Sequence, residues 1–259
     1  VDGDSNPTDF DGDNIVDPEA GMTRTVNVRF TATDADDNLD DADATAQLSR
    51  DGVNRPAIPV SCTCTSGCAT DTRTYDCLNI DMQYYDDNAN DWTATVSIDD
   101  TLGAVASVGT TQAFTFSLLR DIVFTGGTPI NFPTVSPGGS NYESLVDLTM
   151  RNDANYDATA VADGGDGDVM VTAFDLVGVT IPADTIPAVN FDASDGSSDP
   201  CAGATTLGAA QQQVTDVILT KGDGTGTGSI AFCLTSVPGA INSQVYQAIG
   251  GNQWVIELE

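Results

Sequence analysis

Histidine is absent from the sequence, and Lys221 is the only lysine. Without histidine, the Ser-His-Asp and Cys-His mechanisms are excluded in their usual form. Lysine and arginine together number 8 against 39 acidic residues, which leaves a formal net charge of -31. Nucleic acids and anionic membrane surfaces both need a basic footprint that is missing here. No stretch approaches the roughly 20 apolar residues of a membrane span, so we expect no direct membrane insertion.

This excess of negative charge opposes compaction through self-repulsion, so external cations must offset it. Bound divalent ions and high external salt are the two candidates, and a halophile's solvated surface is the simpler alternative. Disorder is disfavoured because 40% of the residues are hydrophobic and many of them alternate with polar ones. A pair of carboxylates could hydrolyse glycosides, but nothing distinguishes one pair among so many. We therefore expect a protein that is not an enzyme.

The dominant hydrophobic period is two, which is typical of half-buried strands. Apolar and polar residues alternate over residues 25–32, 92–98, 114–118, 146–151 and 254–259. Turn signals such as Asp51-Gly52 separate the strands, and residues 207–213 are the best candidate for a short helix. The pattern predicts an all-β fold of antiparallel β-sandwiches. We place an acidic segment at 1–21, one sandwich at 22–119 and a second at 120–259.

The cysteines are even in number, and the first four fall in one short window. Zinc is the rival interpretation, but structural zinc sites favour CxxC spacings, often with histidine. Disulfides fit better, and they predict an oxidising, extracytoplasmic compartment. Cys201 and Cys233 form the natural remaining pair, whereas three connectivities stay open within the window. The six residues are Cys62, Cys64, Cys68, Cys77, Cys201 and Cys233. Because the chain opens at Val1 with polar, acidic residues, we expect a mature, processed product.

The N-terminal segment carries the sharpest motif, with aspartates at alternate positions around Gly12. Ca²⁺ takes six to eight oxygen ligands, which a tight acidic loop can supply. An EF-hand is excluded because Asn14 and Ala20 stand where that loop needs glycine and glutamate. The alternative is an acidic disordered tail. The predicted ligands are Asp9, Asp11, Asp13, Asp17 and the main-chain carbonyl of Ile15.

The run 6–17 (NPTDFDGDNIVD) resembles the thrombospondin type 3 calcium repeat. The resemblance implies calcium at the four aspartates just named, and a second ion reached by Asp2, Asp4 and Asn6. It covers only this short run, and the usual cysteine of that repeat is absent.

A second acidic run, 34–41, directly follows a core strand, as calcium-binding loops do in cadherin-like domains. Asp34 and Asp36 are its candidate ligands, with a solvated turn as the alternative. The runs 86–91 and 163–168 are predicted to be ordinary turns in the first instance, with calcium as the alternative at each.

The body of the chain is similar to Ig-like sandwich domains of secreted archaeal cell-surface proteins. The similarity rests on residues 31–39 (TATDADDNL), 130–139 (INFPTVSPGG) and 148–153 (LTMRND). It implies two antiparallel Ig-like β-sandwiches located outside the cell, and it names no ligand.

Two functions follow as expectations. The first is a structural subunit of an extracellular filament or surface layer, a homopolymer stiffened by Ca²⁺ and disulfides. Its copies could be joined by strand donation from residues 1–21 or 253–259. The alternative for the second of these ends is that it closes its own sandwich. The second function is a calcium-dependent adhesin or carbohydrate-binding module, with glycans as ligands and Tyr84 and Tyr85 as a possible aromatic surface.

Overall fold

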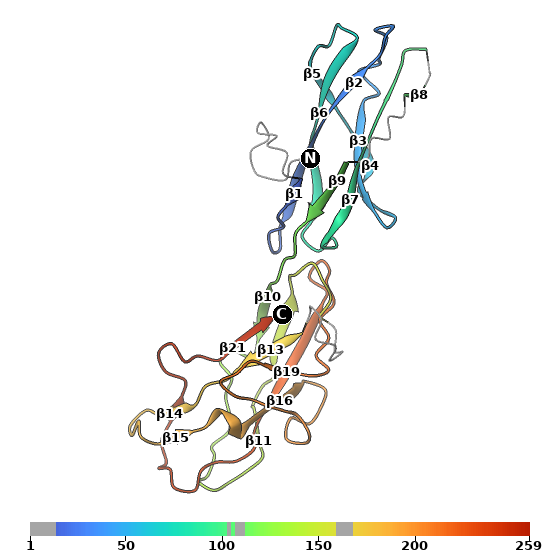
Figure 1. Ribbon diagram of the computed structural model, residues 1–259. Helices are drawn as coiled ribbons and strands as arrows, with labels where there is room; N and C mark the ends of the chain where they lie inside the picture. Colours follow the sequence, from blue (N-terminus) through green and yellow to red (C-terminus); the bar gives the residue numbers. More distant parts are fainter. Residues whose placement is uncertain (1–13, 103–104, 107–111, 159–167) are drawn as a thin grey trace. The chain divides into compact units, whose positions relative to one another are not determined.

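The structure is a computed structural model, which describes residues 14–102, 105–106, 112–158 and 168–259 (Figure 1). The chain forms two compact units, Val1–Leu119 and Arg120–Glu259. Mostly antiparallel sheets make up both units, and the single 3-10 turn η1 (Ala188–Asn190) is the only helical element of the described residues. The predicted all-β fold is confirmed. No helix in this part of the chain is long and apolar enough to cross a membrane.

Two sheets face each other in the first unit. One follows the order β1 (Ile15–Val16), β9 (Gln112–Phe116), β7 (Ala89–Asp99), β3 (Thr45–Arg50) and β4 (Val53–Ser61), with β8 (Val105–Ala106) paired to β7. The other follows the order β2 (Thr23–Thr33), β6 (Thr72–Gln83) and β5 (Thr63–Ser66). Every pair is antiparallel except β1 with β9, which run parallel.

The core of this unit includes inward side chains that the alternation predicts on β2, β7 and β9, and β3 and β6 contribute others that it does not. On β7, Trp92, Ala94, Val96 and Ile98 are all buried. They pack with β2 and β6 side chains of the facing sheet in one apolar cluster. Burial of such faces is the main favourable contribution to folding, at about 25 cal/mol per Å² of apolar surface. The period-two pattern therefore identifies the part of the core that these strands supply, because it identifies their dry faces.

The turn between β3 and β4 follows from its two residues. Asp51 and Gly52 both have positive φ, 46° and 83°. A two-residue hairpin turn of this kind matches the right-handed twist of the strands, and Asp-Gly tolerates it best. The predicted turn is confirmed.

The second unit is also built from stacked sheets. The largest follows the order β10 (Ile122–Gly126), β12 (Leu148–Asn152), β19 (Thr227–Leu234), β16 (Phe191–Asp195) and β17 (Thr205–Thr206), with β11 (Tyr142–Glu143) paired to β19. Two three-stranded sheets complete it: β18 (Gln212–Gln213), β13 (Val169–Thr172) and β21 (Val255–Leu258), then β15 (Thr185–Ile186), β14 (Leu176–Gly178) and β20 (Tyr246–Gln247).

Two local predictions for this unit are wrong. The strand expected over 146–151 begins only at Leu148, and Val146 is 63% exposed. The helix expected over 207–213 is absent, because the backbone N–H of Leu207 donates to the carbonyl of Phe191 and continues the sheet. Tertiary hydrogen bonding thus overrides a weak local preference.

Candidate functional site

Most of the predicted N-terminal calcium ligands lie outside the described residues: Asp2, Asp4, Asn6, Asp9, Asp11 and Asp13. The last two candidates are described. Ile15 belongs to β1 and pairs in parallel register with Thr115 of β9, and Asp17 follows β1 at an exposed position. The end of the predicted calcium segment is therefore joined to the first sandwich. Calcium binding itself stays a prediction.

The second acidic run is a compact turn after β2. The carboxylate of Asp34 accepts backbone hydrogen bonds from Asp36 at 3.1 Å and Asn38 at 3.2 Å. Asp34 thereby shapes the turn that it begins, as aspartate does in many turns. Asp36 is exposed. Both stay predicted calcium ligands.

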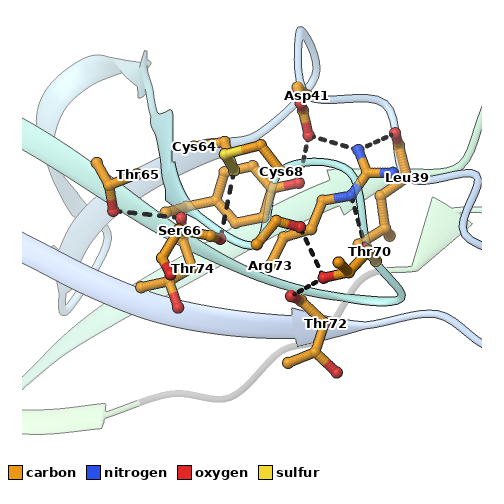
Figure 2. Close-up of a disulfide and its surroundings, with 12 residues drawn as sticks. Leu39, Asp41, Cys64, Thr65, Ser66, Cys68, Thr70, Thr72, Arg73 and Thr74 are labelled. Atoms are coloured by element: carbon orange, nitrogen blue, oxygen red, sulfur yellow. Dashed lines mark hydrogen bonds and ion pairs between the residues drawn. A yellow bond between two sulfur atoms is a disulfide. The ribbon is translucent and has the colours of Figure 1, made fainter.

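An arginine from the neighbouring strand fastens this run (Figure 2). The side chain of Arg73, on β6, is only 8% exposed. Its Nη1 donates to the Leu39 carbonyl at 3.0 Å and to Asp41 Oδ1 at 2.8 Å. Its Nη2 donates to Asp37 Oδ1 at 2.9 Å, and its Nε donates to the Thr70 carbonyl at 3.2 Å. A buried guanidinium thus supplies positive charge to the run, while Asp34 and Asp36 stand outside this set of bonds.

Asp41 also accepts a hydrogen bond from a buried tyrosine. The Tyr75 hydroxyl donates to Asp41 Oδ1 at 2.6 Å. Burial, together with this hydrogen bond, raises the pKa of Tyr75 to about 12. Burial also acts to raise the pKa of Asp41, but the hydrogen bonds from Tyr75 and Arg73 outweigh it and lower that pKa. Asp41 therefore holds its charge inside a formed network.

The acids of residues 86–91 are likewise bound by arginines. Arg55 Nη2 donates a hydrogen bond at 2.5 Å to the Asp86 carboxylate, which is only 3% exposed. Arg50 contacts Asp87 and Asp91, each at 2.6 Å. The expected strand-connecting turn lies at 84–88, between β6 and β7, and Asp91 stands on β7 itself. Arg50 and Arg55, two of the few cationic residues of the chain, are thus paired with specific aspartates.

Three disulfides join all six cysteines. Cys62 lies where the chain leaves β4 for β5 and so changes sheet, and it is bonded to Cys77 of β6. Cys64 of β5 is bonded to Cys68, and this disulfide closes the turn between β5 and β6 (Figure 2). Cys201 is bonded to Cys233, as the sequence predicts. The pairing within the window, left open by sequence, is thereby assigned. Three disulfides are consistent with an extracellular or cell-surface protein.

Sequence reasoning did not single out one acidic recess of the second unit. Glu143, Asp147 and Asp199 line a hollow of about 300 Å³. Ligand atoms of Glu143, Asp199 and Cys201 lie within 4.8 Å of one another. The Cys201 sulfur is bonded to Cys233 and is not a thiolate. The recess therefore offers carboxylates and the serine residues of its lining, and no thiolate.

A larger groove in the second unit has the opposite character. Its volume is about 880 Å³, and none of its lining residues is Asp, Glu, Lys or Arg. Two stretches form its walls, 128–137 and 241–248, and Trp254 and Ile256 are among the lining residues. Nothing in the sequence pattern points to it, because its two walls lie about a hundred residues apart. The lining is therefore uncharged, with asparagine, glutamine and tyrosine side chains among its polar groups.

One wall of the groove is held by an aspartate behind it. Asp184 Oδ2 accepts hydrogen bonds from the Asn242 backbone at 2.9 Å and from the Gln244 side chain at 3.0 Å. The bonds from Asn242, and then those from Gln244 and Tyr246, lower the pKa of Asp184. Gln244 Oε1 in turn accepts from the backbone of Ile181 at 2.7 Å. The wall is pre-formed by these bonds.

No protein-family model matches the chain, and no curated protein matches it. Among solved structures, a chain of a chaperone–tip adhesin complex of CFA/I fimbriae biogenesis is similar over 92% of this chain and 75% of its own length, with a TM-score of 0.30 and 9% identity. A putative membrane anchored protein from Corynebacterium diphtheriae is similar over 90% of this chain and 51% of its own length, with a TM-score of 0.20 and 11% identity. At these scores neither likeness carries an argument about function.

Proposed function

We propose that this chain is a structural subunit of an extracellular assembly, a filament or a surface layer, and not an enzyme. The observation that carries the proposal is the uncharged groove of the second unit in a chain of net charge -31. A pre-formed, charge-free groove on such a chain favours the binding of another uncharged surface. The three disulfides favour work outside the cell, where such bonds persist.

Calcium is part of the proposal because arginine pairing leaves most of the charge uncompensated. Among the residues that the structure describes, ion pairs with aspartates include those of Arg29, Arg50, Arg55, Arg73 and Arg151. The remaining acids outnumber the remaining cations by far, so compaction and self-association need external cations. Asp2, Asp4, Asn6, Asp9, Asp11, Asp13, Ile15 and Asp17 supply the oxygen-rich pattern that suits Ca²⁺.

Strand donation by the C-terminal strand fits this structure less well than a contact between folded surfaces. β21 pairs antiparallel with β13, from Val169 with Leu258 to Thr172 with Val255. Leu258 is buried in the core of its own unit. Donation from this end would first have to withdraw β21 from that core. The other predicted donor, residues 1–21, falls mostly outside the described residues.

Negative-stain electron microscopy of the native chain, with and without chelator, tests the proposal. Regular filaments or sheets are the expected result, and their loss in chelator would locate calcium in the joints. Dispersed monomers under both conditions would overturn the proposal. Specific retention on a glycan surface would then favour the alternative, an adhesin or carbohydrate-binding module.

A further inference from the structure

A short apolar projection stands out on the first unit. Between the pairs Ala46 with Val60 and Leu48 with Arg55, residues 56–59 of β4 lie opposite Gln47 alone. The chain therefore bulges away from β3 at these four residues. Ile58 stands on the bulge and is 79% exposed, with Ala57 and Pro59 also exposed beside it.

The bulge is held in shape from behind. Gln47 Nε2 donates to the Pro56 carbonyl at 2.8 Å and to the Ala57 carbonyl at 3.3 Å. The prolines at 56 and 59 fix φ and offer no backbone N–H. Such an edge is poorly suited to strand addition. Whatever binds here has to bind the side chains of the bulge rather than its backbone.

Charge singles out the surface that could receive this projection. Residues 56–70 contain no charged side chain, although the chain as a whole carries -31. Two copies of so acidic a chain repel each other, and this repulsion is weakest where the surfaces that meet carry no carboxylates. The groove of the second unit meets this condition, because no charged residue lines it.

The size and the surface chemistry of the groove also suit the Ile58 projection. A volume of about 880 Å³ lies within the range of roughly 300–1,000 Å³ typical of pockets that enclose a ligand. It leaves room for more than one side chain. Val245, at the groove, is 66% exposed. The exposed Ile58 leaves apolar surface in water. The groove offers apolar side chains, among them Ile241 and Val245, beside uncharged asparagine and glutamine side chains, and burying the isoleucine against the apolar ones is favourable.

We propose that the 56–59 bulge of one copy inserts Ile58 into the second-unit groove of another copy, an inference that rests on the proposed function as a self-assembling subunit. The projection lies in the first unit and the groove in the second. The contact is therefore heterologous: each copy offers one projection and one groove. Contacts of this kind propagate into a chain of subunits unless the rotation between copies closes a ring.

Two substitutions that introduce an aspartate, each with a matched control, test the contact in the 259-residue chain. Ile58→Asp should abolish assembly, whereas Leu102→Asp, at a residue 83% exposed, should leave it intact. Val245→Asp should abolish assembly, whereas Val189→Asp, at a residue 61% exposed and outside the groove lining, should not. All four positions are exposed, so folding should survive, and circular dichroism checks that it does.

Mixing the two inactive variants sharpens the test. The Ile58→Asp protein keeps an intact groove, and the Val245→Asp protein keeps an intact projection. Together they can form one contact and no more. Light scattering of the mixture should detect a species of twice the 26.8 kDa chain mass, while each variant alone stays a monomer.

The outcomes separate this inference from the proposed function. If the native chain assembles and the Asp variants at 58 and 245 assemble equally well, the contact is wrong and the structural function stands. If a mixture of the two variants stays monomeric, the contact is also wrong. A native chain that never assembles would overturn the proposed function and the contact together.

Discussion

The Tyr75 hydroxyl donates a 2.6 Å hydrogen bond to Asp41, joining strand β6 to the acidic run that follows β2. The two residues are 34 positions apart, and both titrate away from their ordinary values. The bond therefore couples the stability of the first unit to pH at two ends of the scale.

We predict an alkaline loss of stability that Tyr75→Phe removes. Because the pKa of Tyr75 is raised to about 12 from about 10 when unfolded, its contribution is complete below about pH 10. It is lost as the pH rises through the folded value. Denaturant unfolding of the native chain should weaken over this window, and Tyr75→Phe should flatten the dependence. A native titration in which every tyrosine ionises near pH 10 would contradict the prediction.

At acid pH the dependence of stability on pH is the reverse: the Asp41 contribution is lost as the pH falls. The pKa of Asp41 is lowered, so its contribution is present above the ordinary aspartate pKa, about 3.9. It is lost as the pH falls through the lower, folded value. Asp41→Asn should therefore weaken the native chain at neutral pH and make its acid unfolding less steep.

Removing Arg55 should be costly. Arg55→Met would leave the Asp86 carboxylate, 3% exposed, without its cationic partner. Breaking a buried pair from one side typically costs about 3–5 kcal/mol. Arg50→Met is the control, because its partners Asp87 and Asp91 are 44% and 63% exposed and such pairs contribute up to about 1 kcal/mol each. Equal losses in urea unfolding would refute the distinction.

The two disulfides of the first unit should stabilise the fold by different amounts. Replacing Cys62 and Cys77 with alanine releases a loop of 15 residues and should cost about 3 kcal/mol. Replacing Cys64 and Cys68 releases a loop of only 4 and should cost about 2 kcal/mol by the same relation. Chemical unfolding of the two double variants measures both. Free thiols found by alkylation of the unreduced native chain would count against the assigned pairing.

Calcium removal should make the N-terminal segment more sensitive to proteases. Without an ion, Asp9, Asp11, Asp13 and Asp17 repel one another. Asp11→Asn with Asp13→Asn should mimic chelation, whereas Asp223→Asn, a change of charge elsewhere, should not. Limited proteolysis followed by mass spectrometry locates the cuts. Identical cutting with and without chelator would sink the calcium site.

Local signals in the sequence predicted the all-β class and several strands with their buried faces. The dry face around Trp92 and the Asp51-Gly52 turn depend on neighbours along the chain, so periodicity and backbone preference reveal them. Arg73 with Asp41 is a different case, because strand pairing brings the two together over a long sequence separation. The groove is hidden for the same reason, since its walls come from distant, irregular stretches. The strand prediction failed at Val146 because apolar and polar residues can alternate just outside a strand as they do within one.

The bond between Cys62 and Cys77 has a mechanical consequence. A subunit in an extended assembly bears tension along its backbone, and a pulled sandwich ordinarily lengthens as its strands detach. The chain between these cysteines, 15 residues in separation, is bypassed by the cross-link and takes no load. At about 3.5 Å per extended residue, roughly 50 Å of extension is withheld until the bond is reduced. In the proposed assembly, tension through this unit would thus be carried by a shortened, covalently bridged path.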